Sequence, residues 1–300
     1  MADPEYTVAI SNYNMAGTLE ASLTSVLEQV DDRFEVLVVD DGSDDGSEAL
    51  LERLAESYDR LRLELNAGND NLGEARNHSF REAKGDYVLS AVDTDDQFTG
   101  VITQFVTLYH EIEAGVEDEF LLLAGGLYMA PKSLVVETPY RSLGYGEDRD
   151  FYRRLLAKDA LISISHVPFR FSIGYDRSVR EQFEVGLETI VVQFQSGLHF
   201  WPYMRWALKE LRNDGGQLES HRALAHLLLA PVAYLRSRSG PRYDAPEAFT
   251  DLGVYKQALR DAHMTLEGIE EKYDVTVDRD ALGPRGCALF DIDTVDSIID

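Results

Sequence analysis

The chain has 300 residues, with 54 aspartates and glutamates against 28 lysines and arginines, which gives a formal charge of −26. This charge disfavours nucleic acid as a partner, because a polyanion is bound through a basic surface. It suits a protein in concentrated salt, where ions screen self-repulsion, so we expect a halophilic source. The single cysteine, Cys287, excludes an internal disulfide and suggests a reducing compartment.

Membrane-spanning and secreted proteins are also disfavoured. No apolar run approaches the ~20 residues that cross a bilayer. The first residues, MADPEYTVAI, have neither the basic nor the apolar region of a signal peptide. We therefore expect a cytoplasmic protein that is at most peripheral to a membrane, and the oligomeric state stays open.

The first hundred residues alternate between predicted strands and helices. Apolar runs predict strands at 7–10, 34–39, 61–65 and 87–92, and helical spacing predicts helices at 18–29, 44–57 and 74–83. This order is typical of an α/β fold with a mostly parallel sheet and helices on both faces. Parallel strands end at one edge, so the polar segments 11–14, 40–43 and 93–96 should converge there.

An acidic segment follows the predicted strand at 87–92. Asp93, Asp95 and Asp96 lie within four residues and repel one another, so we expect a cation to share the site. Oxygen ligands favour Mg²⁺ or Mn²⁺, either of which can hold a diphosphate. The alternative is a solvated acidic turn in an acidic protein.

Three segments together resemble the family 2 glycosyltransferases of the GT-A fold: TVAISNYN, VVDDGSDDGS and NDNLGEARNHSFREAKGDYVLSAVDTDD. They occur in this order within about the first hundred residues. The resemblance implies a Rossmann-like GT-A sheet and inverting transfer of a sugar from a nucleotide sugar. A UDP-sugar is the favoured donor, the acceptor is a glycan or a lipid-linked molecule, and the implied cofactor is Mn²⁺ or Mg²⁺.

The resemblance also implies residue roles. Asp41 corresponds to the acid that binds the pyrimidine base, and the other implied nucleotide-binding residues are Ser11, Tyr13, Asn14, Gly73, Arg76 and Asp93. Asp93, Asp95 and Asp96 are the implied metal ligands. Two alternatives stay open. Asp41 could cap the following helix, although we assign that cap to Ser43, and Arg76 could form a surface salt bridge.

A second motif, GYGEDRDF at 144–151, resembles the Glu-Asp motif that opens a helix in this family. It implies Asp148 as the general base and Glu147 as its support. Inverting transfer needs a carboxylate to accept the proton of the acceptor hydroxyl, and the amino end of a helix favours a negative charge. The alternative is that both acids only cap the helix.

The next segment, VPFRFSIGYDRSVRE, departs from the family pattern of basic residues. An arginine suits a phosphate fork, so Arg170, Arg177 and Arg180 are alternative partners for the leaving diphosphate. His166 and His199 are candidates for an additional metal ligand, but a lone histidine is more often structural.

The carboxyl-terminal third is predicted to be helical at 183–195, 201–211, 221–238 and 252–272, with irregular structure beyond. Segment 221–238 is apolar with flanking arginines, so it could lie on a membrane surface. Packing against the catalytic domain, with a bend at Pro231, is the favoured alternative. We predict a GT-A catalytic domain at 1–182, with a nucleotide-sugar half at 1–98 and an acceptor half at 99–182, and a helical extension at 183–300.

Two other functions are alternatives to sugar transfer. A sugar nucleotidyltransferase would need a glycine-rich loop with Arg and Lys after the first strand, and SNYNMAG has neither basic residue. A non-catalytic nucleotide-sugar-binding relative or scaffold is the other alternative, and the acids at every motif argue against it.

Overall fold

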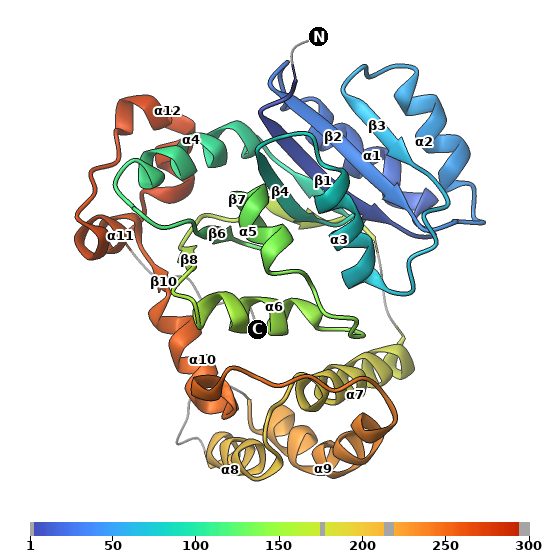
Figure 1. Ribbon diagram of the computed structural model, residues 1–300, viewed down its shortest axis with the longest axis vertical. Helices are drawn as coiled ribbons and strands as arrows, with labels where there is room; N and C mark the ends of the chain where they lie inside the picture. The colour runs from blue at the N-terminus through green and yellow to red at the C-terminus, as the bar shows by residue number, and fades with distance from the viewer. Residues whose placement is uncertain (1–2, 175–177, 213–218, 294–300) are drawn as a thin grey trace. The chain divides into compact units, whose positions relative to one another are not determined.

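The computed structural model describes residues 3–174, 178–212 and 219–293, and these residues form two compact units (Figure 1). The first, called the sheet unit, comprises the described residues of 1–139, 160–175 and 262–300. The second, called the helical unit, comprises those of 140–159 and 176–261. Each unit is therefore assembled from separate stretches of the chain.

The sheet unit contains an eight-stranded sheet in the order β10-β8-β6-β7-β4-β1-β2-β3. All neighbouring strands pair in parallel except those that pair with β7, which runs opposite to β4 and β6. The strands are β1 Tyr6–Asn12, β2 Phe34–Asp40, β3 Leu61–Glu64, β4 Tyr87–Val92, β6 Leu121–Ala124, β7 Leu127–Pro131, β8 Leu161–Ile164 and β10 His263–Met264. The predicted mostly parallel α/β sheet is confirmed.

Helices cover this sheet because its strands alternate their side chains between two buried faces. Tyr6, Val8 and Ile10 of β1 join a large apolar core together with α1, α2, α4, α11 and α12, while α3 packs on β1 and β2 with residues outside that core (Figure 1). The helices are α1 Ala16–Leu27, α2 Ser47–Ala55, α3 Leu72–Glu82, α4 Ile102–Glu113, α5 Lys132–Glu137, α11 Leu266–Tyr273 and α12 Arg279–Phe290. A separate two-stranded sheet pairs β5 Asp96–Phe98 with β9 Arg170–Ser172.

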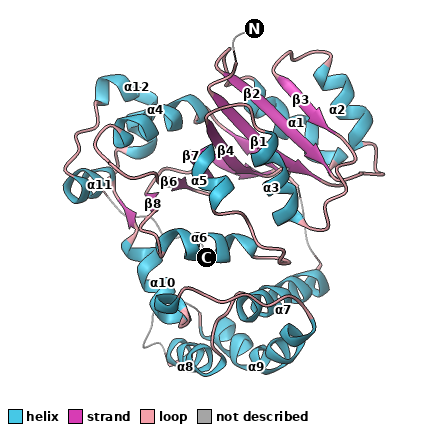
Figure 2. Ribbon diagram, viewed as in Figure 1, coloured by secondary structure: helices cyan, strands magenta, loops and turns pink. Residues whose placement is uncertain are grey.

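In the described part of the helical unit the regular elements are all helices, joined by loops, as Figure 2 shows. They are α6 Glu147–Leu156, α7 Val179–Gln195, α8 Phe200–Leu211, α9 Ser220–Arg236 and α10 Leu252–Asp261, with 3₁₀ turns at Ser237–Ser239 and Glu247–Phe249. An apolar core is shared by α7, α8, α9 and α10. No helix in the described residues is both long enough and apolar enough to cross a membrane.

Two predictions about the carboxyl-terminal region are wrong. The expected helix at 252–272 is interrupted, because His263 and Met264 form β10 beside β8 and Thr265 then caps α11 by accepting from the Gly268 amide. The expected irregular tail contains α12, whose residues Leu282, Leu289 and Phe290 are buried in the core of the sheet unit. In both segments, contacts with distant parts of the chain determine the local structure. The predicted boundary at residue 182, between a catalytic domain and a helical extension, stays a prediction.

Candidate functional site

The predicted convergence of polar segments is found at the carboxyl edge of the sheet. β1 lies between β2 and β4, so the residues that follow these strands share one edge. Asp40 is buried there and accepts from the side chain of Asn12 at 2.7 Å, the amides of Gly42 and Ser43, and the Ser43 hydroxyl. Asp40 thus fixes the loop after β2.

This geometry corrects the helix cap predicted for Ser43. The Ser43 Oγ accepts from the Asn14 amide at 2.8 Å and donates to Asp40, so it ties the β1 and β2 loops together. Helix α2 begins later, at Ser47. Its N-cap residue is Gly46, which has no side chain to accept a hydrogen bond from the first turn. Asn14 completes the link by accepting from the Asp44 amide, in a left-handed backbone conformation (φ 54°).

The residues assigned to the base pocket occupy the same edge. The Asp41 carboxylate accepts from the side-chain nitrogen of Asn69 at 2.6 Å and from its amide at 3.3 Å. Tyr13 is exposed over 61% of its surface, which leaves its ring available for stacking. Among the described residues, the buried hydroxyl of Ser11 and the Oδ1 of Asn12 have no hydrogen-bond partner, an arrangement that a polar ligand would relieve.

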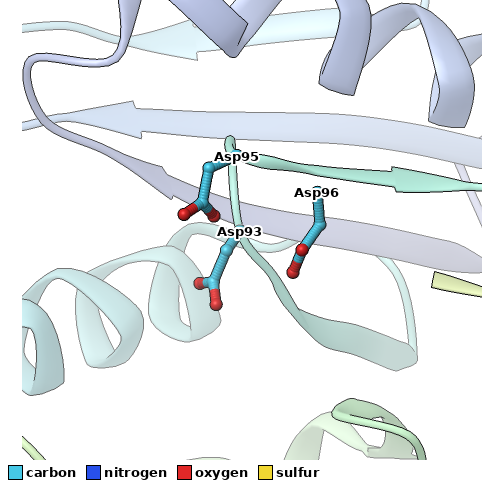
Figure 3. Close-up of side chains that lie close together, drawn as sticks. All are labelled: Asp93, Asp95 and Asp96. Carbon is cyan, nitrogen blue, oxygen red and sulfur yellow. The ribbon is translucent and has the colours of Figure 1, made fainter. Parts of the chain in front are cut away.

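The acidic segment forms a compact cluster just past β4. Asp93, Asp95 and Asp96 each offer a carboxylate oxygen, and these atoms lie within 4.8 Å of one another. Figure 3 shows the three side chains extending to the same side of the turn. The Asp93 carbonyl accepts from Ser22 of α1, and Asp96 starts β5, which pairs with β9. Both flanks of the turn are thereby anchored.

Two arginines contact this cluster from different elements. Arg76, buried on α3, lies 3.6 Å from Asp93, and Arg170 of β9 lies 3.3 Å from Asp96. Burial raises the pKa of Asp96 to about 6, and the charges of Asp95 and Asp93 raise it further against the opposing effect of Arg170. Burial is therefore the main reason why the charged form of Asp96 is disfavoured, and Arg170 offsets only part of that effect.

The donor set of the cluster fits a hard divalent cation. Three carboxylates supply only oxygen ligands, which are the ligands that Mg²⁺ and Mn²⁺ prefer. These three acids are the only such group among the described residues. His166 is not part of it: its Nδ1 lies 3.1 Å from the Val167 carbonyl and its ring packs on Phe169.

The remaining nucleotide-site predictions have the following positions. Gly73 is buried in the first turn of α3, whose cap is Asn71, accepting from the Glu74 amide. Arg76 forms a salt bridge, as the alternative predicted, but its side chain is buried rather than at the surface, and its partner Asp93 belongs to the cluster. Arg177 lies outside the described residues.

The helical unit holds the second predicted motif at the amino end of α6. Glu147 is buried and accepts from the Gly146 amide, while the half-buried Asp148 accepts from the Arg149 amide at 2.8 Å. A third acid, Asp150, is fully buried between Arg141 at 3.1 Å and Arg154 at 2.9 Å. Asp150 therefore has a structural role.

Two further candidates also lie in the helical unit. Arg180 is exposed over 86% of its side chain and pairs with Glu184 on the same helix, which gives no support to a phosphate role. His199 is the N-cap residue of α8, and its amide donates to the Thr250 carbonyl.

Sequence reasoning missed two residues at the sheet edge. Asn69 holds Asp41, and the turn-rich segment NAGNDNLG was the available signal. Gly126, in the turn between β6 and β7, has φ +89°, and a Cβ there would lie 2.5 Å from a terminal nitrogen of Arg170. The Gly-Gly pair signalled a turn, but nothing in the sequence linked it to Arg170.

The sequence of the sheet unit matches known proteins. Residues 7–117 match the family described as Glycosyl transferase family 2. EpsE of Bacillus subtilis (strain 168), named as a glycosyltransferase, is 35% identical over 94 residues, covering 31% of this chain and 34% of that protein. The cholesterol galactosyltransferase of Borreliella burgdorferi is 31% identical over 112 residues, covering 37% of this chain and 30% of that protein. The chain thus spans about a third of these relatives.

Solved structures extend the likeness in fold. S. aureus TarS 1-349 in complex with UDP is 16% identical with a TM-score of 0.50, covering 90% of this chain and 91% of that chain. Glucosyl-3-phosphoglycerate synthase from Mycobacterium tuberculosis, solved with Mn²⁺ and UDP, is 18% identical with a TM-score of 0.50, covering 65% and 80%. At these identities the likeness is one of fold.

Proposed function

We propose that the protein is an inverting glycosyltransferase that moves a sugar from a nucleotide sugar, preferably a UDP-sugar, to a glycan or lipid-linked acceptor. The observation that carries this proposal is the Asp93, Asp95 and Asp96 cluster at the carboxyl edge of a mostly parallel sheet, within the segment that matches glycosyltransferase family 2. The edge where parallel strands end is the usual ligand site of such sheets.

The donor would be held by groups already positioned at this edge. Asp41, fixed by Asn69, would accept from the N3–H of uracil, and the exposed ring of Tyr13 would stack on the base. The Ser11 hydroxyl would gain a polar partner. UDP complexes of proteins with this fold support that assignment.

Asp95 and Asp96, with Asp93 beside the ribose, would hold a divalent cation, which neutralises charge on the leaving nucleoside diphosphate when bound. Arg170 is the arginine best supported as a diphosphate partner, because it contacts Asp96 directly. Its guanidinium would share the negative charge of that carboxylate and of a phosphate oxygen.

Asp148 would accept the proton of the acceptor hydroxyl as that oxygen attacks the anomeric carbon, and the sugar–phosphate bond breaks on the opposite face. Its place in the first turn of α6 supports this role, because the amino end of a helix stabilises a carboxylate. Glu147 would support the turn through its bond with Gly146.

The direct test is calorimetric titration of UDP, then GDP, with Mn²⁺ and with a chelator, in concentrated KCl. We expect UDP to bind with metal, and Asp95→Ala to weaken binding at least tenfold. The matched control is Asp59→Ala, an exposed acid just before β3 at the opposite edge of the sheet. Failure of both nucleotides to bind would overturn the proposed donor site.

A non-catalytic nucleotide-sugar-binding protein is the remaining alternative, and it predicts binding without transfer. The halophilic source, the cytoplasmic location and contact with a membrane through residues 221–238 stay predictions. The last of these gains a specific structural basis from helix α9.

A further inference from the structure

Helix α9 presents an apolar stripe to solvent. Leu224, Leu228, Val232 and Leu235 are exposed by 46, 67, 50 and 64%. Their spacing of four, four and three residues places them on one face of the helix. The buried alanines 223, 230 and 233 belong to the packed side of the helix. The fold therefore uses one face of α9 for packing and leaves a second apolar face open.

Residues 220–243, which include the stripe, carry a net charge of the opposite sign to that of the whole chain. Residues 220–243 contain no Asp or Glu, although the whole chain has 54 in 300. The same segment contains the exposed arginines 222, 236, 238 and 242. Acidic side chains keep the rest of the surface soluble. Residues 220–243 lack them at the place where apolar side chains are exposed, so a need to limit repulsion among acids does not explain this local composition.

A third feature lies near the carboxyl end of α9. The Phe200 ring packs on Tyr234 of α9 with 4.9 Å between ring centroids, and the next residue, Trp201, is exposed over 73% of its surface. An exposed indole suits the boundary between water and lipid. The Arg238 guanidinium lies 5.3 Å from the centre of the Tyr234 ring, so a cationic group and aromatic rings occur together there.

We propose that this face of α9 docks on the surface of an anionic lipid bilayer. A surface helix with an apolar face and basic residues at both ends binds by burying the apolar side chains and pairing the basic ones with lipid headgroups. A second copy of the chain fits less well, since an isologous pairing of two such stripes brings arginines together, and the acid at the amino end of α9, Glu219, already pairs with Arg222 of its own helix at 3.9 Å. The proposal does not depend on transferase activity, but it favours a lipid-linked acceptor if that activity holds.

The experiment measures binding of the full chain to sedimenting vesicles, without any nucleotide. The probes are vesicles of phosphatidylcholine alone and vesicles with one third phosphatidylglycerol, at two KCl concentrations in which circular dichroism shows folded protein. Leu228→Gln/Leu235→Gln tests the stripe, with Val254→Gln/Val136→Gln, at exposed residues outside it, as the apolar control. Arg236→Gln/Arg238→Gln tests the charge, with the exposed pair Arg53→Gln/Arg81→Gln as the control.

We expect the anionic vesicles to bind the protein, more weakly at the higher salt concentration. The leucine variant should lose roughly a hundredfold in partitioning, since each leucine is worth about tenfold. The arginine variant should lose roughly tenfold, and only on anionic vesicles. The control variants should bind like the wild type.

Two results would overturn the proposal. The first is absence of vesicle binding, or equal binding by the leucine variant and its control. The second is a wild-type dimer in analytical ultracentrifugation that the leucine variant abolishes, because the face would then join two copies. Either result leaves the nucleotide titration unaffected, so the two proposals fail separately.

Discussion

The two units each bury an aspartate, and the surroundings of these acids differ. Asp150, in the helical unit, lies between two arginines at 2.9 and 3.1 Å. Asp96, in the sheet unit, has one arginine and two neighbouring acids, and its pKa is raised to about 6. A buried carboxylate held by two arginines is part of the packing of its unit, whereas a buried carboxylate with a raised pKa beside two other acids is a candidate ligand site.

Within α6 we expect a similar difference between Asp148, which would serve the reaction, and Asp150, which serves the fold. We expect Asp148→Asn to lower the rate of sugar transfer about 10³-fold while UDP binding is unchanged, because a general base contributes that order of magnitude. Single-turnover transfer and calorimetry on the same preparation would measure both quantities.

Asp150→Asn is the matched comparison, two residues further along. It leaves two half-buried arginines without their carboxylate, so we expect a loss of about 3 kcal/mol in the free energy of unfolding. If Asp148→Asn destabilised the protein equally, or weakened UDP binding, the assignment of Asp148 as the base would be wrong.

A half-buried histidine gives the helical unit its own dependence on pH. His226 of α9 hydrogen-bonds with Tyr203, and burial lowers its pKa to about 4, with smaller contributions from the charges of Lys256 and Arg149. Between pH 6.5 and 4 the unfolded chain therefore binds a proton that the folded chain does not. The free energy of unfolding must fall as the pH falls through this window, by at most about 3 kcal/mol.

Chemical unfolding at pH 7 and at pH 4.5, for the wild type and for His226→Gln, measures this effect. Glutamine can keep a hydrogen bond to Tyr203 but does not titrate, so the variant should lose less stability on acidification. Carboxylates titrate alike in both proteins. An identical loss in both would rule out His226 as the source.

The sequence predicted the first hundred residues better than the later segments that complete the sheet unit, for a physical reason. Strand and loop motifs at 7–14, 34–43 and 87–96 are local, and parallel pairing alone brings them to one edge. The cap assigned to Ser43 failed because its hydroxyl bonds across to Asn14, in another loop. The contact between Gly126 and Arg170 joins segments 44 residues apart, and no periodicity reveals it.

The carboxyl-terminal region illustrates the same limit. Propensity supported one helix at 252–272, but strand pairing between Met264 and Ile164 divides it. The exposure of one face of α9 was equally hidden, since apolar residues at 224, 228, 232 and 235 are as compatible with a packed helix. Sequence patterns identify apolar faces, and tertiary structure decides which of them are covered.

Gly126 provides a test of whether Arg170 is positioned by its neighbours. In Gly126→Ala the new Cβ would meet the Arg170 guanidinium at 2.5 Å, so we expect weaker UDP binding, by about tenfold, together with a loss of about 1–2 kcal/mol from the positive φ. Gly46→Ala is the control, because it has a similar positive φ and no atom within 4 Å. Equal UDP affinity in the two variants would contradict the positioning role.

The smallest predicted effect is that of a glycine-to-alanine substitution made once in each unit. Gly186 lies inside α7 with open space around its Cβ position, and Gly46 also has open space but has φ +99°. We expect Gly186→Ala to stabilise the helical unit by about 0.5–1 kcal/mol, because alanine is the better helix former. Gly46→Ala should destabilise the sheet unit by about 1 kcal/mol, because alanine resists a left-handed backbone. Thermal unfolding of both variants would measure the two signs. The same sign in both would mean that backbone conformation is not what distinguishes these glycines.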